Sequence, residues 1–168
     1  GMQIHPNPLG VLANSPDFSW HMTNLRNYLT VQPDPPDDVY WGENELTPFG
    51  QGAGTFGLPG DYTSPSRFVR TAYLKTHVPL PENRSEAVIT GFHILENVSI
   101  PKDVVMTQRD TADFTQYTAL INTARGEYFI RSCSNSEIVT RRLANTSVAG
   151  GTPVPMLKVL RPITIFGL

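Results

Sequence analysis

The segments near the C-terminal end of the sequence read as strands with apolar side chains on both faces, and this limits the folds available. Residues 115–123 and 126–133 alternate with period two, and residues 137–143 follow as a third segment. In the first segment Tyr117 and Leu120 point to opposite faces, so neither face is clearly polar. A sheet of this kind needs a second covering layer, and this chain has few residues left to supply one.

Helix signals precede these strands. After an apolar segment at residues 9–13, which we expect to form a short strand, Ser15 suits an N-cap and Pro16 suits the first helical position. Ser64 and Pro65 repeat this pattern and predict a second helix. Both helices are therefore expected to begin at a serine.

A third helix is predicted at about residues 85–98, where Asn83 and Glu86 resemble a capping box. Residues 31–48 are rich in proline and acidic side chains, and we interpret them as an excursion that contains a hairpin. The order of strand, helices and meander predicts a single α+β domain over residues 1–168, with an antiparallel sheet and helices on one face.

The composition argues against several functional classes. The chain has 168 residues, 17% of them charged, and a formal net charge of −2, so we expect no nucleic-acid partner. No apolar run approaches the length of a bilayer span, so we expect no membrane partner. Cys133 is the only cysteine, which excludes an internal disulfide and favours a cytoplasmic location.

Gly52, Gly54 and Gly57 form the G-x-G-x-x-G pattern that is typical of dinucleotide-binding loops. The polar segment before them contains Pro48 and is not typical of a buried strand, and Pro59 follows where a helix would have to begin. We interpret these glycines as a means to reach positive φ and close backbone approach in a long ordered loop, and we expect no cofactor.

The remaining chemistry-bearing side chains indicate no metal site. The histidines lack metal-ligand spacing and have no cysteine pair beside them; they are His5, His21, His77 and His93. Those at 21 and 93 lie on predicted helices and are expected to be packing or surface residues. Cys133 could act as a nucleophile, but a buried, inert thiol is the favoured interpretation. Composition and spacing alone therefore name no reaction.

Several longer stretches, in order, resemble the choloylglycine hydrolase family, which includes penicillin V acylases and conjugated bile salt hydrolases. They are GVLANSPDFSWHMTNLRNYL, LTPFGQGAGTFGLPGDYTSPSRFVRTAYLK, FHILENVSIPKDVV, and DFTQYTALI with GEYFI. The resemblance covers about residues 9–143, whereas residues 144–168 match poorly. The segment PPDD followed by LTPFGQGAG is most similar to the penicillin V acylase branch.

The resemblance implies an N-terminal nucleophile hydrolase that cleaves linear amides with a cysteine whose own α-amino group acts as the base. The family fold is a four-layer αββα sandwich, of which this chain would be the C-terminal half. Met2 offers no thiol and Cys133 has no α-amine, so neither can replace that cysteine. We therefore expect this chain to be inactive by itself.

Two positions match residues of the family's active site. Asn14 corresponds to the asparagine whose amide helps to stabilise the tetrahedral oxyanion, and Arg67 corresponds to the arginine beside the nucleophile. Alternatively, Asn14 shapes the entry to its helix and Arg67 is a surface residue of a first helical turn.

Two further expectations follow. The chain could instead be a non-catalytic remnant or binding module that retains part of an acyl pocket. Its sheet should expose apolar side chains, which predicts a homo-oligomer, most simply a two-fold dimer with sheet packed on sheet. Residues 31–48 should add a second contact, because the corresponding family segment helps to build tetramers.

Overall fold

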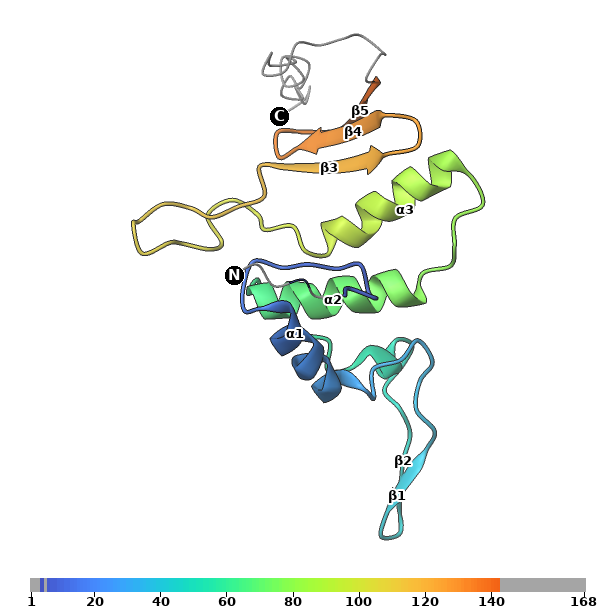
Figure 1. The fold of residues 1–168 in the computed structure, drawn as a ribbon. Helices are drawn as coiled ribbons and strands as arrows, with labels where there is room; N and C mark the ends of the chain where they lie inside the picture. The colour runs from blue at the N-terminus through green and yellow to red at the C-terminus, as the bar shows by residue number, and fades with distance from the viewer. Residues whose placement is uncertain (1–3, 5, 143–168) are drawn as a thin grey trace, which may run out of the picture. The chain divides into compact units, whose positions relative to one another are not determined.

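The computed structural model describes residue 4 and residues 6–142, so the predicted unmatched tail at 144–168 lies outside the described part. The chain divides between Pro79 and Leu80 into two compact units. We call them the N-terminal unit and the C-terminal unit. Helices and small antiparallel sheets are both present, so the α+β class is confirmed (Figure 1).

The described residues of the N-terminal unit form two α-helices, two short 3₁₀ turns and one β-hairpin. The elements are α1 (Phe18–Asn24), η1 (Leu25–Tyr28), β1 (Val39–Trp41), β2 (Asn44–Leu46), η2 (Ala53–Thr55) and α2 (Ser64–His77). β1 and β2 pair antiparallel, with Trp41 opposite Asn44. The hairpin predicted in the acidic excursion is therefore present, and it extends away from α1 and α2 (Figure 1).

The strand predicted at residues 9–13 does not form. The side chain of Asn7 instead accepts a 2.8 Å hydrogen bond from Gly10 N and donates a 3.0 Å hydrogen bond to Val11 O. No strand of the described residues pairs with this segment, and an extended segment without a neighbour has no ladder to join. Val11 is nevertheless buried against Phe68 and Ala72.

Both helices are capped by a residue other than the predicted serine. Asp17, not Ser15, caps α1, because its carboxylate accepts a hydrogen bond from a backbone N–H of the first turn. Thr63, not Ser64, caps α2, and its hydroxyl accepts a 3.4 Å hydrogen bond from Ser66 N. Each segment offers two cap-forming residues within two positions of each other, and propensity alone does not distinguish them.

The core of the N-terminal unit lies between α1, α2 and the segment before α1. Val11, Phe68 and Ala72 are buried, and Phe18 packs against them. The ring of His21 is stacked on Phe68, with the ring centroids 4.4 Å apart. The histidine on α1 is therefore a packing residue, as expected.

Up to residue 142, where the described part ends, the C-terminal unit contains one helix and a three-stranded antiparallel meander. The elements are α3 (Arg84–Glu96), β3 (Tyr117–Asn122), β4 (Glu127–Ser132) and β5 (Asn135–Arg142). The strand order is β3-β4-β5, with Leu120, Phe129 and Thr140 aligned across the sheet. The predicted meander is confirmed.

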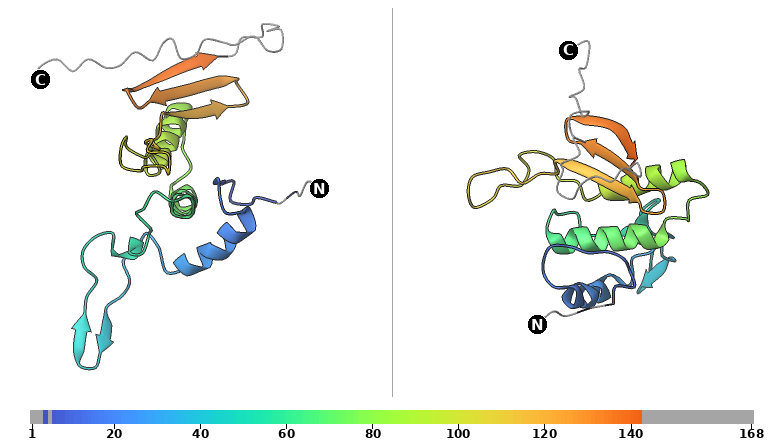
Figure 2. Two further views of the ribbon diagram at one scale, coloured as in Figure 1. Left: turned by 90° about the vertical axis from the view of Figure 1, so that its left-hand side faces the viewer. Right: turned by 45° about the horizontal axis from the view of Figure 1, so that its top comes forward.

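α3 lies along one face of this sheet (Figure 2). A β-carbon placed on Gly91 would come within 2.9 Å of Leu120 Cδ1, so the helix approaches β3 closely. Asn83 caps α3 by accepting a hydrogen bond from Glu86 N, as predicted. The second half of the capping box is absent, because the Glu86 carboxylate accepts from Glu82 N instead.

The opposite face of the sheet is mainly apolar and exposed, with Arg141 opposite Tyr128 as a charged member. Ala119, Ile130 and Val139 lie side by side across the three strands. Tyr117 is 58% exposed and Ile121 is 55% exposed. The expectation that the second face is also apolar is met, and we refer to it as the open sheet face.

Candidate functional site

The two residues matched to the family's active site both lie in the N-terminal unit, and one hydrogen bond links the segments that carry them. Ser15 N donates to Ser64 Oγ at 3.2 Å, across 49 positions of the sequence. Asn14 directly precedes this donor and is exposed. The structure therefore brings residues 12–15, which we call the Asn14 segment, to the first turn of α2, and the same turn carries Arg67.

Arg67 lies three residues after Ser64, on the same side of α2. Its backbone N–H donates to Thr63 O at 3.0 Å as part of the helix. Its side chain is half-buried, and the buried Nε has no hydrogen-bond partner among the described residues. A buried N–H of a cation that lacks a partner is costly, and a group outside the described residues could satisfy it.

A carboxylate is fixed beside the same helical turn. Ser66 Oγ donates to Asp61 Oδ2 at 2.6 Å, and Thr63 N donates to Asp61 Oδ1 at 2.9 Å. The hydrogen bond from Ser66, together with those from Thr63, lowers the pKa of Asp61 from 3.8 to about 2. Arg70 Nη1 donates to Pro59 O at 2.6 Å and to Asp61 O at 2.8 Å. These bonds attach α2 to the end of the preceding loop, residues 52–61, which we call the glycine-rich loop.

The glycines of this loop serve the backbone. Gly52 and Gly57 have φ values of 84° and 101°, in the left-handed region. A β-carbon on Gly54 would collide with Asp34 O and lie 2.6 Å from Gln32 O. The interpretation of these glycines as providers of positive φ and close approach is confirmed, and only the three-residue turn η2 follows the first of them.

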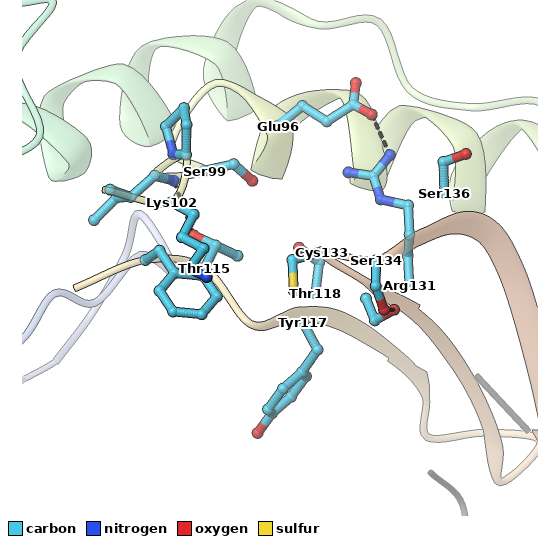
Figure 3. A pocket seen from close by; sticks show the side chains of 14 residues that line it. Glu96, Ser99, Lys102, Thr115, Tyr117, Thr118, Arg131, Cys133, Ser134 and Ser136 are labelled. Carbon is cyan, nitrogen blue, oxygen red and sulfur yellow. Dashed lines mark hydrogen bonds and ion pairs between the residues drawn. The ribbon is translucent and has the colours of Figure 1, made fainter. Parts of the chain in front are cut away.

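The C-terminal unit contains a hollow of about 760 Å³ beside the end of α3 and the end of β4 (Figure 3). Arg131 forms an ion pair with Glu96 on one side of it. Lys102 and Thr115 line the other side, and Cys133 lies between these two groups. Because Arg131 is paired with Glu96, Lys102 is the charged side chain of the lining that has no ion pair among the described residues.

Cys133 is exposed rather than buried, which corrects the expectation of a buried thiol. β4 ends at Ser132 and β5 begins at Asn135, so Cys133 lies in the turn between them. A side chain in such a tight turn is not enclosed by the sheet. Its backbone N–H donates to Gln116 O at 2.9 Å, which fixes the turn.

The histidines show no metal-binding arrangement in the described part of the chain. His21 is 1% exposed, and neither of its ring nitrogens has a hydrogen-bond partner there. His93 is exposed on α3, and His5 lies outside the described residues. Residue 4 and residues 6–142 contain no group of three histidine, cysteine or acidic side chains that could hold a metal ion. No helix within them is long and apolar enough to cross a bilayer.

Sequence reasoning missed two polar side chains around the Arg67 turn. Ser64 was assigned to capping, but its hydroxyl contacts Ser15 N instead. Nothing in the local sequence of Asp61 indicates that Ser66 will donate to it. The only available signal was the density of hydroxyl residues in the segment DYTSPS.

Comparison with protein families now assigns the chain. The profile of the linear amide C–N hydrolases of the choloylglycine hydrolase family matches residues 1–154. The chain belongs to this family. The chain corresponds to less than half of the length of the relatives described below, so their activity is not assigned to this chain.

Two bacterial relatives illustrate the similarity. A conjugated bile acid hydrolase of Lactobacillus gasseri is 36% identical over 143 residues, which cover 85% of this chain and 45% of the relative. A bile salt hydrolase/transferase of Clostridium perfringens is 36% identical over 137 residues, covering 82% and 42% respectively. The chain thus spans less than half the length of these relatives.

Solved structures of bacterial amide hydrolases also match part of their length to this chain. An alanine variant of the conjugated bile acid hydrolase from Clostridium perfringens matches with a TM-score of 0.71 and 34% identity, over 82% of this chain and 42% of that protein. A penicillin V acylase from Agrobacterium tumefaciens matches with a TM-score of 0.57 and 22% identity, over 79% and 35%. The second likeness supports the fold alone. Contrary to the branch expected from the sequence, the higher identities are with bile acid hydrolases.

Proposed function

We propose that this chain supplies Asn14 and Arg67 to the active centre of a linear-amide hydrolase. The Asn14 amide would donate to the oxyanion of the tetrahedral intermediate, and Arg67 would favour the thiolate of a cysteine nucleophile. The observation that carries the proposal is the buried Arg67 Nε, which has no described partner and lies one turn from the bond between Ser15 and Ser64. An active-centre partner would satisfy that N–H.

The nucleophile would lie in the part of the family fold that these 168 residues do not cover. The chain would then supply about half of an αββα sandwich. The open sheet face supports this arrangement, because it is apolar and its Tyr117 and Ile121 are more than half exposed. Without the other half, the chain is proposed to be inactive.

The proposed substrates are amides of the conjugated bile acid type. The support is the similarity to relatives named as conjugated bile acid hydrolases, at up to 36% identity. Penicillin V is the alternative, by likeness to the acylase fold. Assays of the two compounds in parallel would distinguish them.

Complementation tests this function. The chain would be co-expressed with the N-terminal portion of the Clostridium perfringens relative that it does not match, and hydrolysis of a conjugated bile acid and of penicillin V would be measured. We expect activity only with both parts present, and a loss of at least about 100-fold in kcat for Asn14→Ala and for Arg67→Ala.

The exposed Asn27→Ala serves as the control for these two variants and should keep full activity. Two results would contradict the proposal: hydrolysis by the chain alone, or complemented activity that both active-centre variants retain. Neither result depends on which of the two substrates is cleaved.

A non-catalytic binding module is the second candidate. It is supported by a hollow of about 320 Å³ in the N-terminal unit, lined mainly by apolar side chains that include Leu25, Leu58, Val69 and Tyr73. An apolar acid could enter such a space. Calorimetry of the chain with a bile acid and with phenoxyacetate, compared with Val69→Trp, would detect this binding.

Self-association and a cytoplasmic location complete the proposal. The open sheet face and the exposed hairpin residues Tyr40 and Trp41 offer two apolar surfaces for a second copy of the chain. The single cysteine suits a reducing compartment, and cell fractionation with an antibody to the chain tests this.

A further inference from the structure

The hydroxyl of Ser64 is available for a role other than helix capping. Thr63 caps α2, so the Ser64 side chain is not needed to satisfy the first N–H groups of the helix. Its Oγ instead accepts the backbone N–H of Ser15 at 3.2 Å. This is the one hydrogen bond that the structure records for residues 12–15 within the described chain.

The position of Asn14 therefore depends on few hydrogen bonds, although Ala13 packs against the core of the N-terminal unit. Before it, the Asn7 side chain holds Gly10 and Val11, and after it Asp17 begins α1. Between these points the chain is neither helix nor paired strand. The backbone of such a segment is fixed by the side chains that bond to it, together with the packing of its apolar residues Val11 and Ala13.

Arg67 is fixed independently of that segment. It lies three residues along α2 from Ser64, so the serine and the arginine share one side of the helix. Two other side chains of α2, Ser66 and Arg70, donate hydrogen bonds to the end of the glycine-rich loop, at Asp61 and at Pro59 respectively. The same two turns of α2 thus hold two separate segments through different side chains.

We propose that Ser64 is a positioning residue: its hydroxyl sets the Asn14 amide in register with Arg67. This inference rests on the proposed function of those two residues. Ser64 itself touches no reacting atom; it acts through the Ser15 N–H. Loss of the hydroxyl should leave α2 and its cap intact and release the Asn14 segment.

The sharpest test compares Ser64→Val with Ser64→Thr, which have the same shape but differ in the hydroxyl. In the isolated 168-residue chain, hydrogen exchange at the Ser15 amide is measured by NMR. We expect exchange about fivefold faster in the valine variant, which is the change expected for one lost hydrogen bond, and near-normal exchange in the threonine variant. Equal exchange in the two variants would overturn the proposal.

The complemented enzyme provides the second measurement. Ser64→Val should lower kcat about tenfold and change KM less than twofold, and Ser64→Thr should restore kcat. In an Asn14→Ala background, the valine substitution should have almost no further effect, because the group that it positions is gone. Additive losses would show that Ser64 acts by another route and would refute the role assigned to it.

Two controls separate the possible failures. Ser66→Ala removes the bond to Asp61 and should leave Ser15 exchange unchanged. The exposed Ser85→Val, on α3, should change neither exchange nor kcat. If complementation yields no activity, the proposed function fails while Ser15 exchange still decides whether Ser64 holds the Asn14 segment.

Discussion

Ser66 Oγ donates a 2.6 Å hydrogen bond to Asp61 Oδ2, and this contact joins α2 to the end of the glycine-rich loop. Ser66 is buried, whereas Asp61 is exposed, so the bond fixes a surface carboxylate against the helix. Because only the charged carboxylate accepts such bonds well, this contact, together with the hydrogen bonds from Thr63, lowers the pKa of Asp61 to about 2.

The stability of the chain should therefore depend on Asp61 in acid. A carboxyl group whose pKa is lower in the folded state stabilises the fold above its unfolded pKa, and that contribution disappears as the pH falls. For Asp61, the loss should occur between about pH 4 and the folded pKa of about 2. Urea unfolding at several pH values should show a smaller acid dependence for Asp61→Asn than for the unaltered chain.

Other carboxylates also titrate in this range. The quantity to compare is therefore the difference in the free energy of unfolding between the unaltered chain and Asp61→Asn at each pH. Hydrogen bonds lower the pKa of Asp17 and of Glu127 as well, and these groups remain in both proteins. Parallel curves for the unaltered chain and Asp61→Asn across this range would contradict the assignment.

Gly54→Ala should destabilise the N-terminal unit. Its β-carbon would collide with Asp34 O and lie 2.6 Å from Gln32 O, and both are backbone atoms that cannot rotate away. Overpacking of this kind costs roughly 1–3 kcal/mol. The same substitution should weaken the 2.9 Å bond from Gln32 N to Gly54 O, which hydrogen exchange at Gln32 would report.

Gly60→Ala is the matched control, since a β-carbon there meets no atom within 4 Å. It should leave the free energy of unfolding within about 0.5 kcal/mol of the unaltered chain. Equal effects of the two substitutions would mean that residues 32–34 and residue 54 do not approach each other as described.

Sequence reasoning succeeded where local patterns determine the structure. The period-two alternation located β3 and β4, and the asparagine at position 83 located the start of α3. It failed at residues 9–13, because a strand requires a partner that local sequence does not supply. The hydrogen bonds accepted by Ser64 and by Asp61 could not be predicted from local sequence either, because each forms only when the chain has folded.

His21→Phe should stabilise the chain by about 1 kcal/mol. The ring is 1% exposed and stacked on Phe68, and neither nitrogen has a described partner. An unsatisfied buried polar group costs about 1–3 kcal/mol, and a phenyl ring keeps the stacking without that cost. Thermal unfolding gives the comparison, with the exposed His93→Phe as the control. A lower melting temperature for the buried variant would indicate that His21 has a partner in solution.

Cys133 should react readily with a thiol reagent in the folded chain. It is exposed in the turn between β4 and β5 and is the only cysteine, so one equivalent of reagent should be consumed without denaturant. Cys133→Ser should leave unfolding, ligand binding and complemented activity unchanged. Loss of binding or activity in a folded serine variant would place chemistry at this turn.

The chain should self-associate through the open sheet face. Covering roughly 600 Å² of apolar surface at about 25 cal/mol per Å² contributes on the order of 15 kcal/mol before association costs. Light scattering at micromolar concentration should therefore give at least twice the 18.6 kDa of one chain. Ile121→Lys, on the open face, should shift the chain to monomer, whereas Val104→Lys should not, although the two side chains are 55% and 54% exposed. A monomer in every case would mean that another group covers this face.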